Sequence, residues 1–203
     1  MQLTVIIVNY NSKKYILNCL ESVCRFQSAK NFEWIIVDNN SSDNSKNEIL
    51  NRFPFVRWLD MGYNAGFARA NNAGISNCAG ESVLLLNPDT IILNDSISEC
   101  LNRFSKAEEI ACSVQLLNPD NSPQITGNYF MKGGLNYLLP LPYLGRLLRE
   151  IALLFKVKKT SVLHANNEQQ VDWINGAFLM VKKNAIEKVG LMDEDFFLYA
   201  EEA

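Results

Sequence analysis

The sequence predicts an α/β fold organised around a parallel β-sheet. Short apolar runs alternate along the first half of the chain with segments whose apolar residues recur at helical spacing. The clearest run, residues 83–86, is uniformly apolar, which is typical of a parallel strand buried on both faces. Strands that alternate with helices of this length form βαβ units, whose strands pair in parallel. The pattern therefore predicts a mostly parallel sheet flanked by helices.

Four strands and four helices are expected in order up to residue 104. The predicted strands span residues 3–8, 34–37, 56–59 and 83–86. The predicted helices span residues 15–23, a short stretch that starts near residue 45, residues 68–75 and residues 96–104. Ser12 is expected to cap the first helix, and Ser45 with Glu48 has the spacing of a capping box for the second.

The alternation breaks after residues 111–117. Residues 118–123 (NPDNSP) have turn chemistry, and we expect a hairpin tip in which Asp120 has a turn role. A strand at 177–181 and a helix at 184–189 follow, and residues 191–203 are rich in acids and aromatics. We therefore expect two halves of one domain, residues 1–117 and a smaller, mixed part at residues 118–203.

Residues 127–165 form a basic window. The window holds six Lys or Arg residues and a single acid, Glu150, although the whole chain carries a formal charge of −3. Between residues 143 and 155, leucines at helical spacing predict an amphipathic helix. Two interpretations stay open: a peripheral contact with a membrane surface, or a helix packed on the sheet with its lysines in solvent. Glycines at 133 and 134 and prolines at 140 and 142 favour a flexible insert.

Composition argues against several function classes. With 203 residues the chain can form one substantial core, and its charge of −3 argues against nucleic acid as a partner. The five cysteines form no C-x-x-C pair, which favours reduced thiols over a disulfide frame or a zinc site. We find no signal-peptide pattern and no apolar run long enough to span a bilayer. We therefore expect a cytoplasmic protein.

Polar residues follow three of the predicted strands at the point where each ends. These exits are residues 9–11 (NYN), 38–40 (DNN) and 87–89 (NPD). Because the carboxyl ends of parallel strands lie along one edge, the exits are expected to border one crevice. A ligand rich in hydrogen-bonding groups would explain them, although Asp and Asn also favour helix caps and turns. The candidate ligand-binding residues of the exits are Asn9, Tyr10, Asp38, Asn40, Asn87 and Asp89.

The chain lacks both common backbone loops for phosphate. No G-x-G-x-x-G follows the first strand, and no G-x-x-x-x-G-K-[ST] occurs anywhere. If the ligand carries a diphosphate, its charge needs another partner, and a hard divalent cation held by few carboxylates is the usual one. Asp89 is the best-placed metal ligand, and Asn87 offers an uncharged oxygen two residues earlier. We expect Mg²⁺ or Mn²⁺ as the cofactor.

Six ordered motifs carry a resemblance to a known family. They are VIIVNYNS, IIVDNNSSD, GYNAGFARANNAG, LLLNPDT, WINGAFLMVKK and GLMDEDFFLYAEEA, and they cover nearly the whole chain. The chain resembles the family 2 glycosyltransferases and is most similar to the rhamnosyltransferase-like branch that builds cell-surface polysaccharides. The resemblance implies a GT-A fold, with a Rossmann-like twisted sheet. It also implies inverting transfer of a sugar, such as rhamnose, from a nucleotide diphosphate donor to a glycan or lipid-linked acceptor.

The resemblance assigns roles to individual residues. Residues 1–117 would be the nucleotide-sugar-binding half and residues 118–203 the acceptor-side half, with the flexible basic insert at about 127–165. Glu202 stands where the catalytic base is expected. The implied donor-binding residues are Asn9, Tyr10 and Asp38 at the base and ribose, Asn64, Gly66 and Asn71 beside the donor, and Asn87 and Asp89 in the metal motif.

Three residues are candidates for the acceptor side. An aromatic plane suits the C–H face of a sugar, which favours Trp173, although a core or rim position explains this residue equally well. Gly176 would permit close approach of the acceptor. Asp193 is either a secondary polar contact or a solvated loop acid.

Two departures from the family pattern leave alternatives open. The metal motif begins with Asn87 instead of Asp, and the base follows in a Glu201-Glu202 pair instead of Glu-Asp. The family continues beyond residue 203, so we expect a C-terminally truncated domain that binds its donor and can still be inactive. A non-catalytic nucleotide-sugar-binding or scaffold subunit is one alternative. A sugar-nucleotide nucleotidyltransferase is a weaker one, because the segment after the first strand has no glycine.

From the resemblance and the basic window we expect peripheral contact with the inner membrane face.

Overall fold

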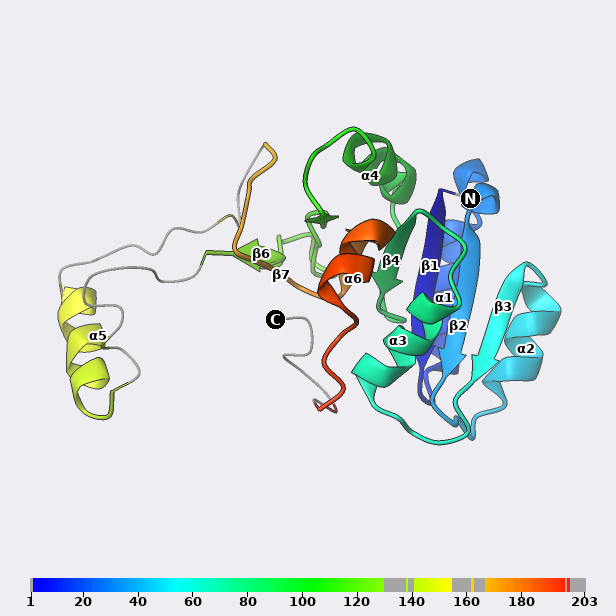
Figure 1. Ribbon diagram of the computed structural model, residues 1–203, viewed down its shortest axis with the longest axis horizontal. Helices are drawn as coiled ribbons and strands as arrows, with labels where there is room; N and C mark the ends of the chain where they lie inside the picture. Colours follow the sequence, from blue (N-terminus) through cyan, green and yellow to red (C-terminus); the bar gives the residue numbers. More distant parts are fainter. Residues whose placement is uncertain are drawn as a thin grey trace. The chain divides into compact units, whose positions relative to one another are not determined.

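The computed structural model divides the chain into two compact units. It describes residues 2–129, 138, 141–154, 162, 167–195 and 197. The larger unit comprises Met1–Val114 and Asn175–Ala203, and the smaller comprises Gln115–Ile174. Each unit is described by itself below (Figure 1). The predicted boundary between residues 117 and 118 stays a prediction.

A six-stranded sheet forms the centre of the larger unit. Its strand order is β3-β2-β1-β4-β8-β5. The first four of these strands are parallel, and β8 and β5 each pair antiparallel with their neighbours. The strands span β1 (Leu3–Asn9), β2 (Glu33–Asp38), β3 (Val56–Asp60), β4 (Ser82–Leu86), β5 (Ala111–Cys112) and β8 (Phe178–Lys182). The predicted mostly parallel α/β sheet is confirmed.

Helices cover the sheet in the way that βαβ connections require. They are α1 (Lys13–Val23), the 3₁₀ helix η1 (Gln27–Asn31), α2 (Ser45–Arg52), α3 (Phe67–Ser76), α4 (Ser96–Phe104) and α6 (Lys183–Val189). Figure 1 shows α3 and α6 in front of the sheet. Gly74 lets α3 pack closely on β1, because a Cβ at this position would lie 2.6 Å from Cγ2 of Ile6.

The core lies between α3 and the central strands. Ile6, Ile35, Val37 and Leu85 are buried in one cluster with Ala70 of α3. Burial of an aliphatic side chain of this size stabilises the fold by about 1.5–3 kcal/mol. The fully apolar faces of β1, β2 and β4 therefore fix the part of the sheet from which the polar exits extend.

Two predicted helix caps are wrong. Ser12 occupies the N-cap position of α1, but its hydroxyl donates to the carbonyl of Tyr10 at 3.0 Å and makes no cap bond. A carboxylate oxygen of Asp43 instead accepts from the first N–H of α1 at 3.0 Å. Ser45 is the first residue of α2, and its hydroxyl accepts a hydrogen bond from Nδ2 of Asn9. The first N–H of α2 donates to the other carboxylate oxygen of Asp43 at 3.1 Å, so this one aspartate binds the first N–H of both helices.

The described residues of the smaller unit form two short antiparallel strands and one helix of regular length. Strand β6 (Gly127–Asn128) pairs with β7 (Trp173–Ile174), and α5 spans Leu144–Leu154. Leu117 and Pro123 form an antiparallel bridge, which confirms the predicted hairpin tip at residues 118–123. The predicted amphipathic helix is also confirmed by α5, which leaves Leu147 and Ile151 exposed. Within the described part of the chain, no helix has the length and apolar composition that membrane crossing requires.

Candidate functional site

The strand order places the candidate site at one edge of the sheet. The chain runs outward from β1 through β2 to β3 and then returns to the other side of β1 as β4. In open α/β sheets, ligands bind outside the carboxyl ends of the strands where the order reverses in this way. Asn9 pairs in register with Asp38, and Asp38 pairs with Asp60 on the next strand, so three strand ends carry polar side chains side by side.

The exits of β1 and β2 form one buried hydrogen-bond network. Asn9 is fully buried, and its Nδ2 donates to Oδ1 of Asp38 at 2.7 Å and to the hydroxyl of Ser45 at 2.8 Å. Oδ2 of Asp38 accepts from the N–H of Ser41 at 3.0 Å, and Oδ1 of Asn9 accepts from the N–H of Ser12 at 3.1 Å. Here the two side chains hold the loops in place, and their contact with a donor stays a prediction.

The second exit also contains Asn39, which the sequence analysis did not select. Its side chain is 3% exposed, and its Nδ2 donates to the carbonyl of Gly66 at 3.0 Å. Among the described residues, its Oδ1 is a buried side-chain atom with no hydrogen-bond partner. Asn40, the predicted residue, is exposed and left-handed, with a φ of 64°. Because the chain turns there, Asn39 and not Asn40 faces inward and leaves an acceptor for a ligand N–H or a water.

The loop after β3 leads directly into α3. Oδ1 of Asn64 accepts from the N–H of Gly66 at 3.2 Å, and Gly66 has a φ of 83°, a conformation that favours glycine. Asn71 is buried, and its Nδ2 donates to the carbonyl of Phe67 one turn earlier at 3.1 Å. Asn64 and Gly66 therefore shape the loop beside the exit of β2. Asn71 supports the helix behind it.

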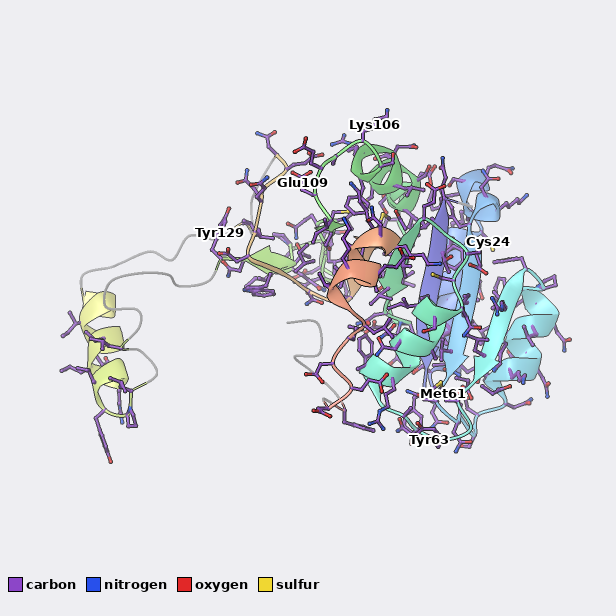
Figure 2. All side chains as sticks on the ribbon, in the orientation of Figure 1. Cys24, Met61, Tyr63, Lys106, Glu109 and Tyr129 are labelled. Atoms are coloured by element: carbon purple, nitrogen blue, oxygen red, sulfur yellow. The ribbon has the colours of Figure 1, made fainter. Side chains whose placement is uncertain are left out.

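Two tyrosines lie exposed in the loops at this edge. Tyr10 follows β1 and Tyr63 follows β3, and each exposes about half of its side chain, 50% and 53%. Figure 2 shows Tyr63 and the neighbouring Met61 at the end of the sheet where β3 finishes. Tyr10 was predicted as a donor contact, and its exposure leaves its ring available for stacking. Tyr63 was not selected, although it stands within the quoted motif GYNAGFARANNAG.

The turn after β4 presents a free carboxylate. The backbone is anchored, because the N–H of Asn87 donates to the carbonyl of Ala177 at 3.0 Å and its carbonyl accepts from Thr90 at 3.2 Å. Asp89 is exposed, and no described residue donates a hydrogen bond or forms an ion pair with its carboxylate. Burial, together with the negative charge of Asp89, raises the pKa of the Cys19 thiol to about 12. The carboxylate therefore lies close to α1.

The residues at this edge fit a cation that the ligand itself helps to hold. Within the described ranges, no three His, Cys, Asp or Glu side chains come together as a metal site would require. Mg²⁺ in phosphate-binding sites is often held by one or two carboxylates, with waters and phosphate oxygens completing its shell. Asp89 can supply one such carboxylate, and Asn87 an amide oxygen. The donor set suits a metal that binds together with a diphosphate.

The predicted acceptor residues belong to different units, and each is described within its own unit. Trp173 belongs to β7 of the smaller unit and is 39% exposed. Gly176 lies in the larger unit, in a turn where Oδ1 of Asn175 accepts from the N–H of Ala177 at 2.8 Å. Oδ1 of Asp193 accepts from the N–H of Asp195 at 3.0 Å, as a loop acid does. Glu202 lies outside the described residues, so its role stays a prediction.

Known proteins are similar in sequence to nearly the whole of this chain. The chain is 29% identical over 98% of its length to the low-salt glycan biosynthesis hexosyltransferase Agl10 of Haloferax volcanii and covers 59% of that protein. It is 26% identical, again over 98% of its length, to the N-acetylglucosaminyl-diphospho-decaprenol L-rhamnosyltransferase of Mycobacterium tuberculosis and covers 67% of it. The chain thus spans about two thirds or less of these relatives.

Solved structures share the fold. A crystal structure of Staphylococcus aureus TarS 1-349 in complex with UDP matches all of this chain, with a TM-score of 0.67 and 16% identity over 53% of that protein. The mannosyltransferase PcManGT of Pyrobaculum calidifontis, in complex with GDP-Man and Mn²⁺, matches 96% of the chain, with a TM-score of 0.63 and 16% identity over 48% of that protein. The sequence model described as glycosyl transferase family 2 matches residues 4–167. The chain belongs to glycosyl transferase family 2.

Proposed function

We propose that the chain binds a nucleotide diphosphate sugar at the carboxyl ends of β1–β4, and that the natural protein transfers this sugar to a glycan or lipid-linked acceptor. The observation that carries the proposal is Asp89, an exposed carboxylate at the switch point of the sheet that has no hydrogen-bond or ion-pair partner among the described residues. Structural neighbours in complex with UDP or GDP-Man support this class of ligand. The hexosyltransferase and rhamnosyltransferase relatives support glycan biosynthesis as the process.

The proposed donor site divides into a nucleotide part and a phosphate part. The buried Oδ1 of Asn39 offers an acceptor for a base N–H, and exposed Tyr10 offers a ring for stacking. Asp89 and Asn87 would hold a divalent cation, Mg²⁺ or Mn²⁺, together with the diphosphate oxygens. When bound, such a cation neutralises the charge that grows on the leaving diphosphate.

The proposed chemistry is a single displacement with inversion. The acceptor oxygen forms a bond to the anomeric carbon while the bond from this carbon to the diphosphate oxygen breaks. Glu202 takes the proton from the attacking hydroxyl, a contribution of about 10²–10⁴-fold in rate. Inversion requires this base on the face of the sugar opposite the diphosphate, and therefore opposite Asp89. Trp173, Gly176 and Asp193 are the proposed acceptor-side residues.

Rhamnose is the proposed sugar, because the Mycobacterium tuberculosis relative is a rhamnosyltransferase. Hexoses are the competing donors, because the Haloferax volcanii relative is a hexosyltransferase. An assay of the full natural protein with a lipid-linked glycan acceptor distinguishes rhamnose from hexose transfer. The donors to test are deoxythymidine diphosphate rhamnose, uridine diphosphate hexoses and guanosine diphosphate mannose. We expect release of nucleoside diphosphate with one of these donors.

The same assay tests the assigned base. Glu202→Gln should abolish sugar transfer and leave nucleoside-diphosphate affinity, measured by calorimetry, unchanged. Transfer by Glu202→Gln at an unaltered rate would exclude Glu202 as the base. Donor binding without transfer in the wild-type protein would favour the alternative function, a nucleotide-sugar-binding or scaffold subunit, for which Asn87 in the metal motif is the supporting observation.

We also propose a cytoplasmic location with peripheral contact at the inner membrane face. The support is α5, whose exposed Leu147 and Ile151 lie in the basic window of residues 127–165. Apolar side chains that alternate with basic ones bind anionic lipid surfaces. Flotation with phosphatidylglycerol vesicles should recover the protein, and removal of residues 127–165 should prevent it. Flotation of both forms alike would contradict this location.

A further inference from the structure

The acidic and aromatic segment after α6 is fixed to α3 at three points. Gly190, with a φ of 100°, ends α6, and the chain then runs along α3 (Figure 1). The N–H of Phe67, the first residue of α3, donates to the carbonyl of Phe197 at 3.0 Å. Nε of Arg69 lies 3.4 Å from Oε2 of Glu194. The third point is the side chain of Asn72.

Asn72 makes the most complete of these contacts. Its side chain is 4% exposed. Its Oδ1 accepts from the N–H of Met192 at 3.0 Å, and its Nδ2 donates to the carbonyl of Met192 at 2.9 Å and to Oε1 of Glu194 at 3.0 Å. A carboxamide offers the same donor and acceptor as a peptide group, so this one side chain binds both backbone groups of Met192. No helix geometry requires asparagine here, since asparagine is a weak helix former.

Gly66, directly before α3, lies between the segment and the proposed nucleotide site. A Cβ at Gly66 would lie 2.6 Å from the carbonyl oxygen of Phe197, so only glycine fits beside the segment. The carbonyl of the same Gly66 accepts from Nδ2 of Asn39 in the proposed nucleotide site. The start of α3 therefore contacts the proposed nucleotide site on one side and residues 192–197 on the other.

We propose that Asn72 is a positioning residue for the transfer reaction. It fixes the described residues 192–195 and Phe197 against α3, and the chain continues from this fixed segment to Glu202, the proposed base. This inference rests on the proposed function. Asn72 itself is buried, and all its side-chain hydrogen bonds among the described residues go to Met192 and Glu194, so it acts through the segment and not on the sugar.

The test compares two asparagines of the same helix. Asn72→Ala removes all three bonds to the segment, whereas Asn77→Ala removes an exposed side chain at the C-terminal end of α3 that bonds to Ala73 and Arg57. The first readout is hydrogen–deuterium exchange of the natural protein, which needs no activity. We expect faster exchange confined to the peptide that covers residues 191–197 in Asn72→Ala, and no change there in Asn77→Ala.

The second readout separates positioning from folding. With the donor that the wild-type protein consumes, Asn72→Ala should lower kcat by at least about tenfold, because a misplacement of about 1 Å can lower the rate by about 10²-fold. Its affinity for the nucleoside diphosphate should stay within about threefold of wild type, as expected when only the later step is lost. Arg69→Ala, which removes one exposed ion pair and keeps the core intact, should show the same pattern more weakly.

Different outcomes overturn different claims. Unchanged exchange of residues 191–197, an unchanged kcat, or equal losses in Asn72→Ala and Asn77→Ala would each overturn the positioning role. A wild-type protein that consumes none of the donors contradicts the proposed function instead. In that case the exchange readout still decides whether Asn72 fixes the segment.

Discussion

The tripeptide Asn-Pro-Asp occurs twice in this chain, after β4 at residues 87–89 and in the hairpin tip at residues 118–120. In the second copy, Oδ1 of Asp120 accepts from the N–H of Ser122 at 2.9 Å and from its hydroxyl at 2.6 Å. In the first copy no described residue donates to Asp89. Both copies close a turn, because the carbonyls of Asn87 and Asn118 each accept from the N–H three residues later, but among the described residues the carboxylate accepts hydrogen bonds only in the second copy.

The two copies differ in the residue two positions after the Asp. Ser122 follows Asp120 at this spacing and supplies a hydroxyl and an N–H, whereas Ile91 follows Asp89 and supplies no side-chain donor. When an Asp carboxylate oxygen accepts hydrogen bonds within its own turn, that oxygen is less available to bind a cation. A tripeptide motif thus indicates a ligand site only together with its neighbours.

Loss of the free carboxylate should have the largest effect. Asp89→Asn keeps the size of the side chain and removes the charge, so we expect transfer to fall by on the order of 10²-fold through loss of charge stabilisation at the diphosphate. The melting temperature should stay the same, because Asp89 is exposed. The loss of transfer is measured as the rate of nucleoside-diphosphate release, with Asp120→Asn as the control for Asp89→Asn. Equal rates in the two variants would remove the distinction between the turns.

A second carboxylate should sharpen the site. Asn87→Asp turns the metal motif into Asp-Pro-Asp, and added ligand charge tightens sites for hard cations. We expect Mn²⁺ to raise nucleoside-diphosphate affinity about tenfold more than in wild type. The matched control is Asn118→Asp in the hairpin tip, which should leave the Mn²⁺ effect unchanged. Calorimetric titration distinguishes them, and a Mn²⁺ effect equal to wild type in Asn87→Asp would place the cation elsewhere.

A hydroxyl added after the first turn should make it resemble the second. Ile91 is 46% exposed, so Ile91→Ser is compatible with the fold. The new hydroxyl would donate to Asp89 and compete with a cation, and we expect metal-dependent affinity to fall by about tenfold, since a hydrogen bond to a charged group contributes about 1.5–3 kcal/mol. Ile91→Ala is the control for lost apolar area. Identical affinities of the two variants would show that the residue two positions later has no such influence.

Removal of the hydroxyl from the second turn should have the smallest effect. The Ser122 hydroxyl and N–H hold the pKa of Asp120 below its ordinary value. Such a group stabilises the folded state above the pKa of the unfolded chain, and this contribution is lost as the pH falls through the folded pKa. In Ser122→Ala the pKa of Asp120 should move up toward its ordinary value, as NMR titration of the carboxyl carbon would detect. No shift would mean that the hydroxyl is not its partner in solution.

Much of the fold followed from local patterns. The apolar runs near residues 3–8, 34–37 and 83–86 became the buried strands β1, β2 and β4, because a strand covered on both faces needs no polar side. The predicted serine caps were wrong because the partners of these serines are not determined by local sequence. The hydroxyl of Ser45 is bound by Asn9, 36 residues earlier, and sequence spacing does not reveal such partners.

The site residues also fall into those that local sequence reveals and those that only the folded structure reveals. Asp89 could be selected from the sequence because a strand end and a proline fix its place. Asn39 could not be distinguished from Asn40, because only the left-handed φ of Asn40 decides which of the two amides turns inward. Asn72 could not be recognised either, since its partner Met192 lies 120 residues away.

The manganese dependence of nucleoside-diphosphate binding tests the central claim most directly. Uridine, deoxythymidine and guanosine diphosphates are titrated into the natural protein, Asp89→Asn and Asp120→Asn, each with and without Mn²⁺. The account predicts that Mn²⁺ tightens binding by at least about tenfold in the wild type and in Asp120→Asn, and that this gain is absent in Asp89→Asn. A full Mn²⁺ gain in Asp89→Asn, or its loss in Asp120→Asn alone, would contradict it.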